Sequence, residues 1–171
     1  MKKVLIVIDM QNDFVKQTLN SNESLAIISN VVEKVKNFDG EVFFTRDTHH
    51  DNYFATLEGE KLPVLHCVKN TDGWQIIDEL LPYIKHRYNV INKYTFGYKD
   101  WNLIFDTEYT EFELCGVCTD ICVVSNALAL RMFYPNAKIT VDASCCAGVT
   151  PEKHAAALEV MKSCQIEVIN E

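Results

Sequence analysis

The chain has 171 residues, a length that fits one domain with a full hydrophobic core. Its apolar fraction of 48% and charged fraction of 23% are typical of a folded globular protein. The net charge of −8 argues against nucleic acid or an anionic membrane as the main partner. No apolar run approaches the ~20 residues that a membrane helix needs. The apolar run at residues 4–8 is also too short for a signal peptide, so we expect a cytoplasmic protein.

Strand patterns alternate with helix patterns along the chain. Runs of apolar and β-branched residues predict strands at residues 3–8, 41–45, 88–92, 111–115, 138–141 and 166–169. Apolar residues at helical spacing predict helices at residues 24–38, 74–81, 123–132 and 151–161, with Pro82 closing the second and Pro151 opening the last. This alternation predicts one α/β domain over residues 1–171, with a mostly parallel sheet between two layers of helices.

Polar residues follow several of the predicted strands. Asp9 ends the first strand, Arg46 and Asp47 end the second, Lys93 ends the third, and residues 116–118 end the fourth. In open α/β sheets the functional site lies beyond the carboxyl ends of the strands. We therefore expect these residues to meet at one edge of the sheet. Residues 46–73 show no clear periodicity, and loops of that length are usually functional.

Cys122 lies between a predicted strand and a predicted helix. A thiol in the first turn of a helix feels the positive end of the helix dipole, which favours the thiolate that a nucleophile needs. The chain has seven cysteines, an odd number that cannot pair fully within one chain. We expect Cys115, Cys145, Cys146 and Cys164 to be buried small hydrophobes. Cys115 and Cys118 form a C-x-x-C, which leaves a redox or zinc-binding role open.

Two residues are candidate partners of this thiol. Asp9 follows five apolar residues, so burial is expected to raise the pKa of its carboxyl toward that of a general base. The alternative is an Asp that caps the next turn. Lys93, near a carboxylate and a thiol, would hold both in their ionised forms. The alternative for Lys93 is an ordinary surface lysine.

A second group of residues has the chemistry of metal ligands. Asp47 and His49 point to the same side of an extended segment, and His66 follows after the long loop. Two imidazoles and a carboxylate suit zinc, manganese or iron(II), with positions open for water or substrate. Glu58 or Glu60 is a candidate further ligand. The remaining histidines, which are His50, His86 and His154, are interpreted as structural or exposed.

These blocks together resemble the isochorismatase-like cysteine hydrolase superfamily, and within it the nicotinamidase-like amidases. The blocks are residues 8–14 (IDMQNDF), 45–49 (TRDTH), 66–68 (HCV), 93–96 (KYTF), 116–123 (GVCTDICV), 142–148 (DASCCAG) and 154–158 (HAAAL). They occur in the family's order along nearly the whole chain. The resemblance implies a Rossmann-like three-layer α/β/α fold and homo-oligomers.

The resemblance also implies roles for individual residues. Asp9, Lys93 and Cys122 would form the catalytic triad, and a cis peptide bond at Val117–Cys118 would aim the amide of Cys118 into an oxyanion site shared with the amide of Cys122. Asp47, His49 and His66 would hold a divalent metal, with zinc first and manganese or iron as alternatives. Phe14 would pack against the substrate. The implied reaction is hydrolysis of a small carboxamide, with nicotinamide as the first candidate.

The chain departs from the nicotinamidase pattern at several positions. Thr48 and His50 replace a Trp and a Pro, residues 62–65 lack a Trp-Pro pair, and position 118 holds Cys instead of Ala or Thr. We expect these changes to line the metal and ring pocket and to affect ring specificity. A carbamoyl or ureido substrate is therefore a second candidate. A non-enzymatic, thiol-rich redox or metal-binding module is a third.

Overall fold

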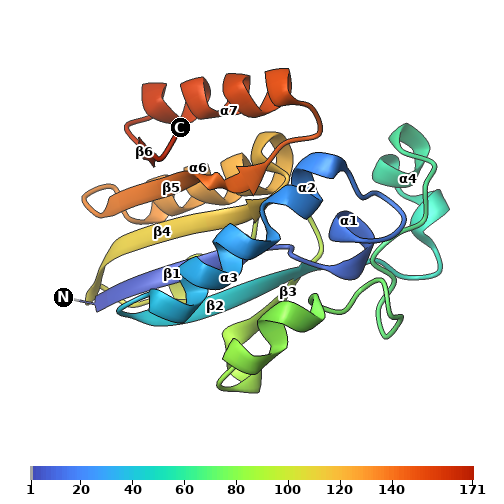
Figure 1. Ribbon diagram of the computed structural model, residues 1–171, viewed down its shortest axis with the longest axis horizontal. Coiled ribbons are helices and arrows are strands. Elements are labelled where there is room, and N and C mark those ends of the chain that lie inside the picture. Colours follow the sequence, from blue (N-terminus) through green and yellow to red (C-terminus); the bar gives the residue numbers. More distant parts are fainter. Residues whose placement is uncertain (1) are drawn as a thin grey trace.

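Six parallel strands form the centre of the computed structural model, which describes residues 2–171 (Figure 1). The strands are β1 (Lys2–Ile8), β2 (Glu41–Asp47), β3 (Val90–Lys93), β4 (Tyr109–Val117), β5 (Lys138–Ala147) and β6 (Glu167–Ile169). They pair in the order β3-β2-β1-β4-β5-β6, and every neighbouring pair is parallel. The prediction of an α/β fold with a mostly parallel sheet is confirmed.

Helices cover the sheet and connect its strands. The α-helices are α1 (Asn12–Val15), α2 (Asn22–Ala26), α3 (Ile28–Asn37), α4 (Leu57–Lys61), α5 (Trp101–Ile104), α6 (Val124–Phe133) and α7 (Pro151–Ser163). Short 3-10 helices occupy Tyr53–Ala55, Asp78–Tyr83 and Arg87–Asn89, and a π-helical turn occupies Thr119–Val123. Figure 1 shows α3 in front of the sheet, α6 behind it and α7 along the β6 side. Among residues 2–171, no helix has both the length and the apolar character that crossing a membrane requires.

Two of the predicted helices differ from the observed ones. The helix predicted at residues 24–38 is divided at Ile27, although the backbone of Ile27 stays in the helical region. The helix predicted at residues 74–81 is wrong, since the observed 3-10 helix starts at Asp78 and runs through Pro82. Backbone hydrogen bonds from Asn12 to Gln75 (2.9 Å) and from Ile77 to Met10 (3.0 Å) hold residues 75–77 against the chain that follows β1. These tertiary bonds override the local helical pattern.

The carboxyl ends of β1 and β4 lie side by side at the point where the strand order reverses. From β1 the chain passes to β2 on one side, whereas β4 lies on the other side of β1 and leads to β5. In doubly wound sheets such a reversal opens a crevice at the strand ends, and ligands bind there. The interior of β1 is fully buried from Val4 to Ile8, so both faces of this central strand are covered.

Gly116 allows β4 to approach β1 closely at this crevice. Its φ is +116°, and a Cβ atom built on it would lie 2.1 Å from the carbonyl oxygen of Ile8. Residues with a side chain rarely adopt this backbone conformation. The oxygen that a Cβ would meet belongs to the buried backbone of β1, which cannot move aside. Gly116 therefore sets the distance between β1, which leads to Asp9, and β4, which leads to Cys122.

Replacing Gly116 with Ala is expected to destabilise the fold by about 2–6 kcal/mol, because a strained φ and an overpacked contact each cost about 1–3 kcal/mol. Urea unfolding followed by circular dichroism measures the change. Gly97→Ala is a suitable control, because a Cβ there would meet Ser125 at no less than 3.3 Å. An equal loss in both variants would contradict the argument.

Candidate active site

Three residues from three separated strand ends meet in the crevice. The Lys93 Nζ atom lies 2.6 Å from Asp9 Oδ2 and 3.4 Å from Cys122 Sγ. The same ammonium lies 3.3 Å from Asp47 Oδ1. The structure thus brings together the three residues that the family resemblance implied as a catalytic triad. Lys93 lies at their centre.

Lys93 is a fully buried ammonium. Its side chain has 0% exposure, which excludes the alternative of an ordinary surface lysine. Burial alone would lower the pKa of Lys93, but Asp9, Cys122 and Asp47 outweigh it and raise that pKa well above the ordinary value. Lys93 is therefore positively charged at neutral pH, and it stabilises negative charge on any of its three neighbours.

Asp9 is also buried, and its carboxylate is anchored from one side. Its residue exposure is 0% and its φ is +49°, a left-handed conformation that turns the chain directly after β1. Thr45 donates a hydrogen bond from Oγ1 to Asp9 Oδ1 at 2.6 Å, and the backbone N–H of Asp9 donates to the same Thr45 oxygen. Burial raises the pKa of Asp9, with Lys93 opposing that shift. A carboxylate with a raised pKa next to a thiol is suited to accept its proton.

Cys122 lies in the π-helical turn Thr119–Val123, which directly precedes helix α6. Burial raises the pKa of Cys122 well above the ordinary value, Asp9 and Asp47 raise it further, and Lys93 opposes them. The helix position was expected to favour the thiolate, but burial and two carboxylates raise the pKa of Cys122 in spite of Lys93. The resting thiol keeps its proton and needs a base.

The backbone before Cys122 has the unusual bond that the resemblance implied. The peptide between Val117 and Cys118 is cis. The carbonyl of Cys118 accepts hydrogen bonds from Ile121 N (3.1 Å) and Val123 N (3.0 Å), the second of which spans five residues and closes the π turn. The amides of Cys118 and Cys122, expected as oxyanion donors, are thus held in one short turn.

A cavity of about 380 Å³ opens onto Cys122, a size within the range of small-molecule sites. Phe14, Phe96, Cys118 and Ile121 give it mostly apolar walls, and Asp47, Glu58, His66 and Lys153 add charged or polar groups. Phe14 packs on His66 with ring centroids 5.4 Å apart, which places Phe14 where the resemblance expects a substrate contact. One cavity therefore reaches both the thiol and the candidate metal ligands.

The departures from the nicotinamidase pattern lie mostly outside this cavity. Of the substituted positions among residues 2–171, Leu62 and Cys118 line it, whereas Thr48 and His50 do not. Thr48 is buried and accepts a hydrogen bond from the indole of Trp74 at 2.9 Å. His50 is exposed and stacks on Tyr94. The expectation that all of these changes line the pocket is wrong, because the side chains of Thr48 and His50 lie outside it.

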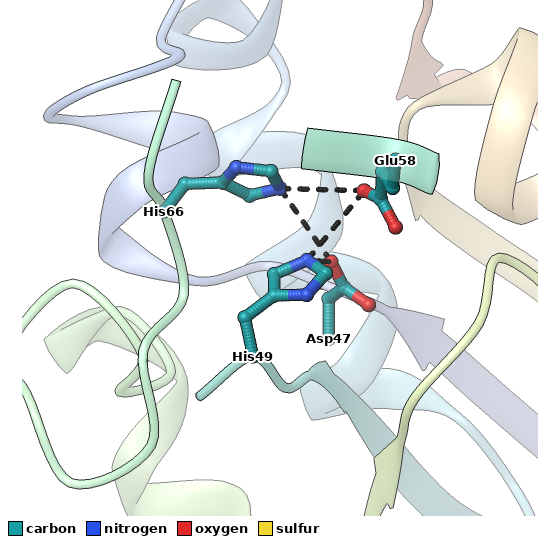
Figure 2. Close-up of side chains that lie close together, drawn as sticks. All are labelled: Asp47, His49, Glu58 and His66. Atoms are coloured by element: carbon teal, nitrogen blue, oxygen red, sulfur yellow. Dashed lines mark hydrogen bonds and ion pairs between the residues drawn. The ribbon is translucent and has the colours of Figure 1, made fainter. Parts of the chain in front are cut away.

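Four side chains form a compact cluster of metal-ligand type (Figure 2). Asp47, His49, Glu58 and His66 each offer one ligand atom, and these atoms lie within 4.8 Å of one another. His49 Nε2 lies 2.9 Å from Asp47 Oδ2 and 3.5 Å from Glu58 Oε1. Glu58 therefore joins the three ligands that the sequence predicted. Glu60, the alternative ligand, is exposed and lies outside the cluster.

The donor set fits a divalent cation. His66 Nδ1 lies 2.8 Å from the carbonyl oxygen of Val64, a contact that assigns the ring proton to Nδ1 and leaves Nε2 facing the cluster. Two carboxylates also face each other here, and burial together with Asp47 raises the pKa of Glu58. A cation between these oxygens would relieve that repulsion. Two imidazoles and two carboxylates with an adjoining cavity suit zinc, manganese or iron(II).

Asp47 links the thiol cluster to the metal cluster. Its Oδ1 atom faces Lys93, and its Oδ2 atom faces His49 and His66. Burial alone would raise the pKa of Asp47, but Lys93 and the two histidines hold it below the ordinary range. The Gln11 side chain accepts from the backbone N–H of Asp47 (2.7 Å) and donates to its carbonyl (2.9 Å), which locks the end of β2 to the end of β1.

Sequence reasoning missed three supporting residues. Thr45 and Gln11 hold Asp9 and Asp47, as described above, and both lie inside blocks that the sequence had singled out. His154, interpreted as structural or exposed, is half-buried and bonds to Thr119 at 2.8 Å. The sequence contains no signal for that contact, because the two residues lie 35 positions apart on separate elements.

The other cysteines are free thiols. Cys115, Cys145 and Cys146 are buried as expected, whereas Cys164 is only half-buried. Burial raises the pKa of Cys118 to about 12. All seven thiols are free, and the described metal cluster contains none of them. The C-x-x-C of Cys115 and Cys118 is therefore not joined as a disulfide.

Similarity to known proteins agrees with this geometry. Residues 3–171 match the isochorismatase domain. A Bacillus subtilis relative, named uncharacterized isochorismatase family protein PncA, is 33% identical over 174 residues, covering 92% of this chain and 93% of the relative. A crystal structure of nicotinamidase/pyrazinamidase PncA from Bacillus subtilis has a TM-score of 0.85 at 27% identity, covering 99% of this chain and 100% of that one. The pyrazinamidase of Pyrococcus horikoshii in complex with zinc has a TM-score of 0.83 at 26% identity, with 100% of both chains covered.

The fold and the site define a parallel α/β domain with a buried thiol, a buried carboxylate and a cluster of metal-ligand type at the strand ends. The chain belongs to the isochorismatase family.

Replacing Glu58 with Gln is expected to weaken metal binding at least about tenfold, because the cluster loses one anionic ligand. The measurement is zinc content by mass spectrometry after dialysis against graded chelator concentrations. Glu60→Gln, at an exposed position two residues away, is the matched control and is expected to retain the metal. Equal metal content in both variants would exclude Glu58 as a ligand.

Proposed function

We propose that this protein is a cysteine amidohydrolase that cleaves a small carboxamide, with nicotinamide, giving nicotinate and ammonia, as the first candidate. The observation that carries the proposal is the single cavity shared by Cys122 and the metal-ligand cluster. A small amide bound there reaches the thiol with its carbonyl and the metal site with a second donor atom. The similarity to solved nicotinamidases and pyrazinamidases supports the choice of substrate.

The reaction begins with proton transfer from Cys122 to Asp9. The thiol is protonated at rest and the Asp9 carboxylate has a raised pKa, so the two pKa shifts suit an exchange of this proton. The Lys93 ammonium, 3.4 Å from Cys122 Sγ, stabilises the thiolate as it forms. The thiolate then attacks the amide carbonyl and forms a tetrahedral intermediate.

The backbone amides of Cys118 and Cys122 donate to the oxygen of this intermediate. One such donor typically contributes ~2.7–4 kcal/mol to transition-state stabilisation. Asp9 gives its proton to the amide nitrogen, the C–N bond breaks, ammonia leaves, and a thioester remains on Cys122. Asp9 then takes a proton from water, and the resulting hydroxide attacks the thioester carbonyl. The C–S bond breaks, the acid product is released, and Asp9 returns its proton to the sulfur of Cys122.

Asp47, His49, Glu58 and His66 would hold the divalent metal. A metal held by these four residues would supply a Lewis acid that could bind a donor atom of the substrate. We assign zinc as the resident metal because two imidazole ligands favour it and because the similar Pyrococcus horikoshii pyrazinamidase was solved with zinc. Phe14 would pack against the ring of the substrate.

Replacing Cys122 with Ala is expected to lower kcat for ammonia release from nicotinamide by a factor on the order of 10⁴ or more, because the nucleophile is removed. Coupled glutamate dehydrogenase detection of ammonia measures the rate. Cys164→Ala, at the half-buried end of α7, is the matched control and is expected to keep the wild-type rate. Ammonia release that survives in Cys122→Ala would exclude the thioester mechanism.

One observation favours a carbamoyl or ureido acid as a second candidate substrate. Lys153 lines the cavity and forms none of the ion pairs found among residues 2–171. Its ammonium is available to a substrate carboxylate, which nicotinamide lacks.

A panel of nicotinamide, pyrazinamide and small ureido acids, assayed by ammonia release, separates the two candidates. Lys153→Met is expected to raise KM for a ureido acid about tenfold, while KM for nicotinamide changes little, because only the acid carries a charge for Lys153. Higher kcat/KM for nicotinamide than for every ureido acid would exclude the second candidate.

Assembly into a homo-oligomer and a cytoplasmic location stay predictions. Two observations agree with them. Phe54 and Leu57, close together near α4, are 58% and 71% exposed, as side chains at an interface between copies would be. Seven free thiols suit a reducing compartment.

A further inference from the structure

The turn that carries Cys122 is tied to helix α7 by a partly buried hydrogen bond. This turn, Thr119–Val123, is called the Cys122 turn below. Thr119 has 0% exposure, and its Oγ1 atom lies 2.8 Å from Nδ1 of His154 on α7. Both partners are side chains, and neither has another side-chain hydrogen bond among residues 2–171. The bond therefore links two elements that are separated by all of α6 and β5.

The base of α7 is itself held rigidly. Thr150 caps the helix by accepting from Lys153 N, and Pro151 occupies the first turn. The loop before it contains Gly148, where a Cβ atom would lie 2.9 Å from the backbone of His154. The loop also donates from Val149 N to Asp120 Oδ1 at 2.9 Å. The start of α7 and the loop before it thus contact the Cys122 turn at two adjacent residues, Thr119 and Asp120.

The position of Thr119 affects two groups that are expected to face the substrate, which are the Cys118 amide and the Cys122 thiol. Thr119 directly follows Cys118, so any shift of Thr119 moves the peptide that orients the Cys118 amide. The carbonyl of Cys118 closes the turn by accepting from Val123 N. At the other end, Asn126 Nδ2 donates to the carbonyl of Cys122 at 2.8 Å. The turn is therefore held at both ends, and α7 supplies the anchor nearest to the oxyanion site.

We propose that Thr119 and His154 are positioning residues, which hold the Cys122 turn so that the thiol and the Cys118 amide face the substrate carbonyl together. Neither residue lines the cavity, so both act through the turn. The consequence for catalysis rests on the proposed amidohydrolase function. The consequence for the thiol itself does not, since it concerns only the alignment of Cys122 with Asp9 and Lys93.

Three variants isolate the bond. Thr119→Val removes the hydroxyl at nearly constant volume, and His154→Leu removes the ring nitrogen. His154→Asn keeps a polar atom close to the position of Nδ1 and is expected to recover most of the loss. Thr140→Val, a buried threonine on β5 whose hydroxyl meets Glu167 at 3.4 Å, is the matched control for the effect of losing a threonine hydroxyl elsewhere.

Alkylation of Cys122 by iodoacetamide, quantified on its peptide by mass spectrometry, measures thiol alignment without any assumption about the substrate. Thr119→Val and His154→Leu are each expected to slow it about tenfold, because a displaced thiol loses its contact with the base. With an amide substrate, the same variants are expected to lower kcat by about 10–100-fold and to change KM by less than about threefold. The double variant is expected to lose no more than Thr119→Val alone, since both changes break one bond.

The outcomes separate the proposals. Alkylation in Thr119→Val and His154→Leu at or above the wild-type rate would overturn the positioning role, and so would losses that Thr140→Val reproduces in full. Wild-type protein that releases no ammonia from any amide, but shows slowed alkylation in both variants, would overturn the amidohydrolase function and support the positioning role. Recovery in His154→Asn would support it further, because a bond partner of similar reach is restored.

Discussion

The site depends on one buried positive charge. An ammonium with 0% exposure is costly in a protein interior unless anionic groups compensate it, and Lys93 lies against the carboxylates of Asp9 and Asp47 and the thiol of Cys122. These groups come from β1, β2 and the turn after β4, while Lys93 itself ends β3. The ends of four parallel strands are therefore joined through one ammonium. Removing either Asp9 or Asp47 leaves the other carboxylate as the one anionic group within residues 2–171 in contact with Lys93.

Asp47 extends this constraint to the metal cluster. One of its oxygens compensates Lys93, and the other faces two imidazoles, so a single carboxylate serves both groups. A divalent cation in the cluster would draw electron density from Asp47 and weaken its compensation of Lys93. The charge near Cys122 would therefore change with metal occupancy through one side chain. Gln11 fixes the backbone of Asp47 by hydrogen bonds to its N–H and its carbonyl, which holds this carboxylate between the two groups.

The positions of the strands along the chain and the polar residues at their ends could be predicted from the sequence, because buried strands have apolar runs that polar residues terminate. Asp9 follows a run of five apolar residues, and Asp47 and Lys93 come at the ends of the predicted strands 41–45 and 88–92. Glu58 could be predicted only as one of two candidates, since α4 decides which of Glu58 and Glu60 faces the histidines. The segment at residues 74–77 was predicted wrongly because hydrogen bonds to Met10 and Asn12 hold it extended. Hydrogen-bond partners that are distant in the sequence cannot be predicted from local periodicity.

The ionisation of Cys122 shows where sequence reasoning ends. The position of Cys122 before a helix was expected to favour the thiolate, but burial and the surrounding carboxylates raise its pKa. The sequence by itself determined the alternating α/β pattern, the family blocks and the types of residue at the strand ends, since each follows from local periodicity and spacing. Only the tertiary structure decided the protonation of Cys122, the choice of Glu58 and the bond between Thr119 and His154. These depend on burial and on side chains that are distant in sequence, and both arise only when the sheet and its helices are assembled.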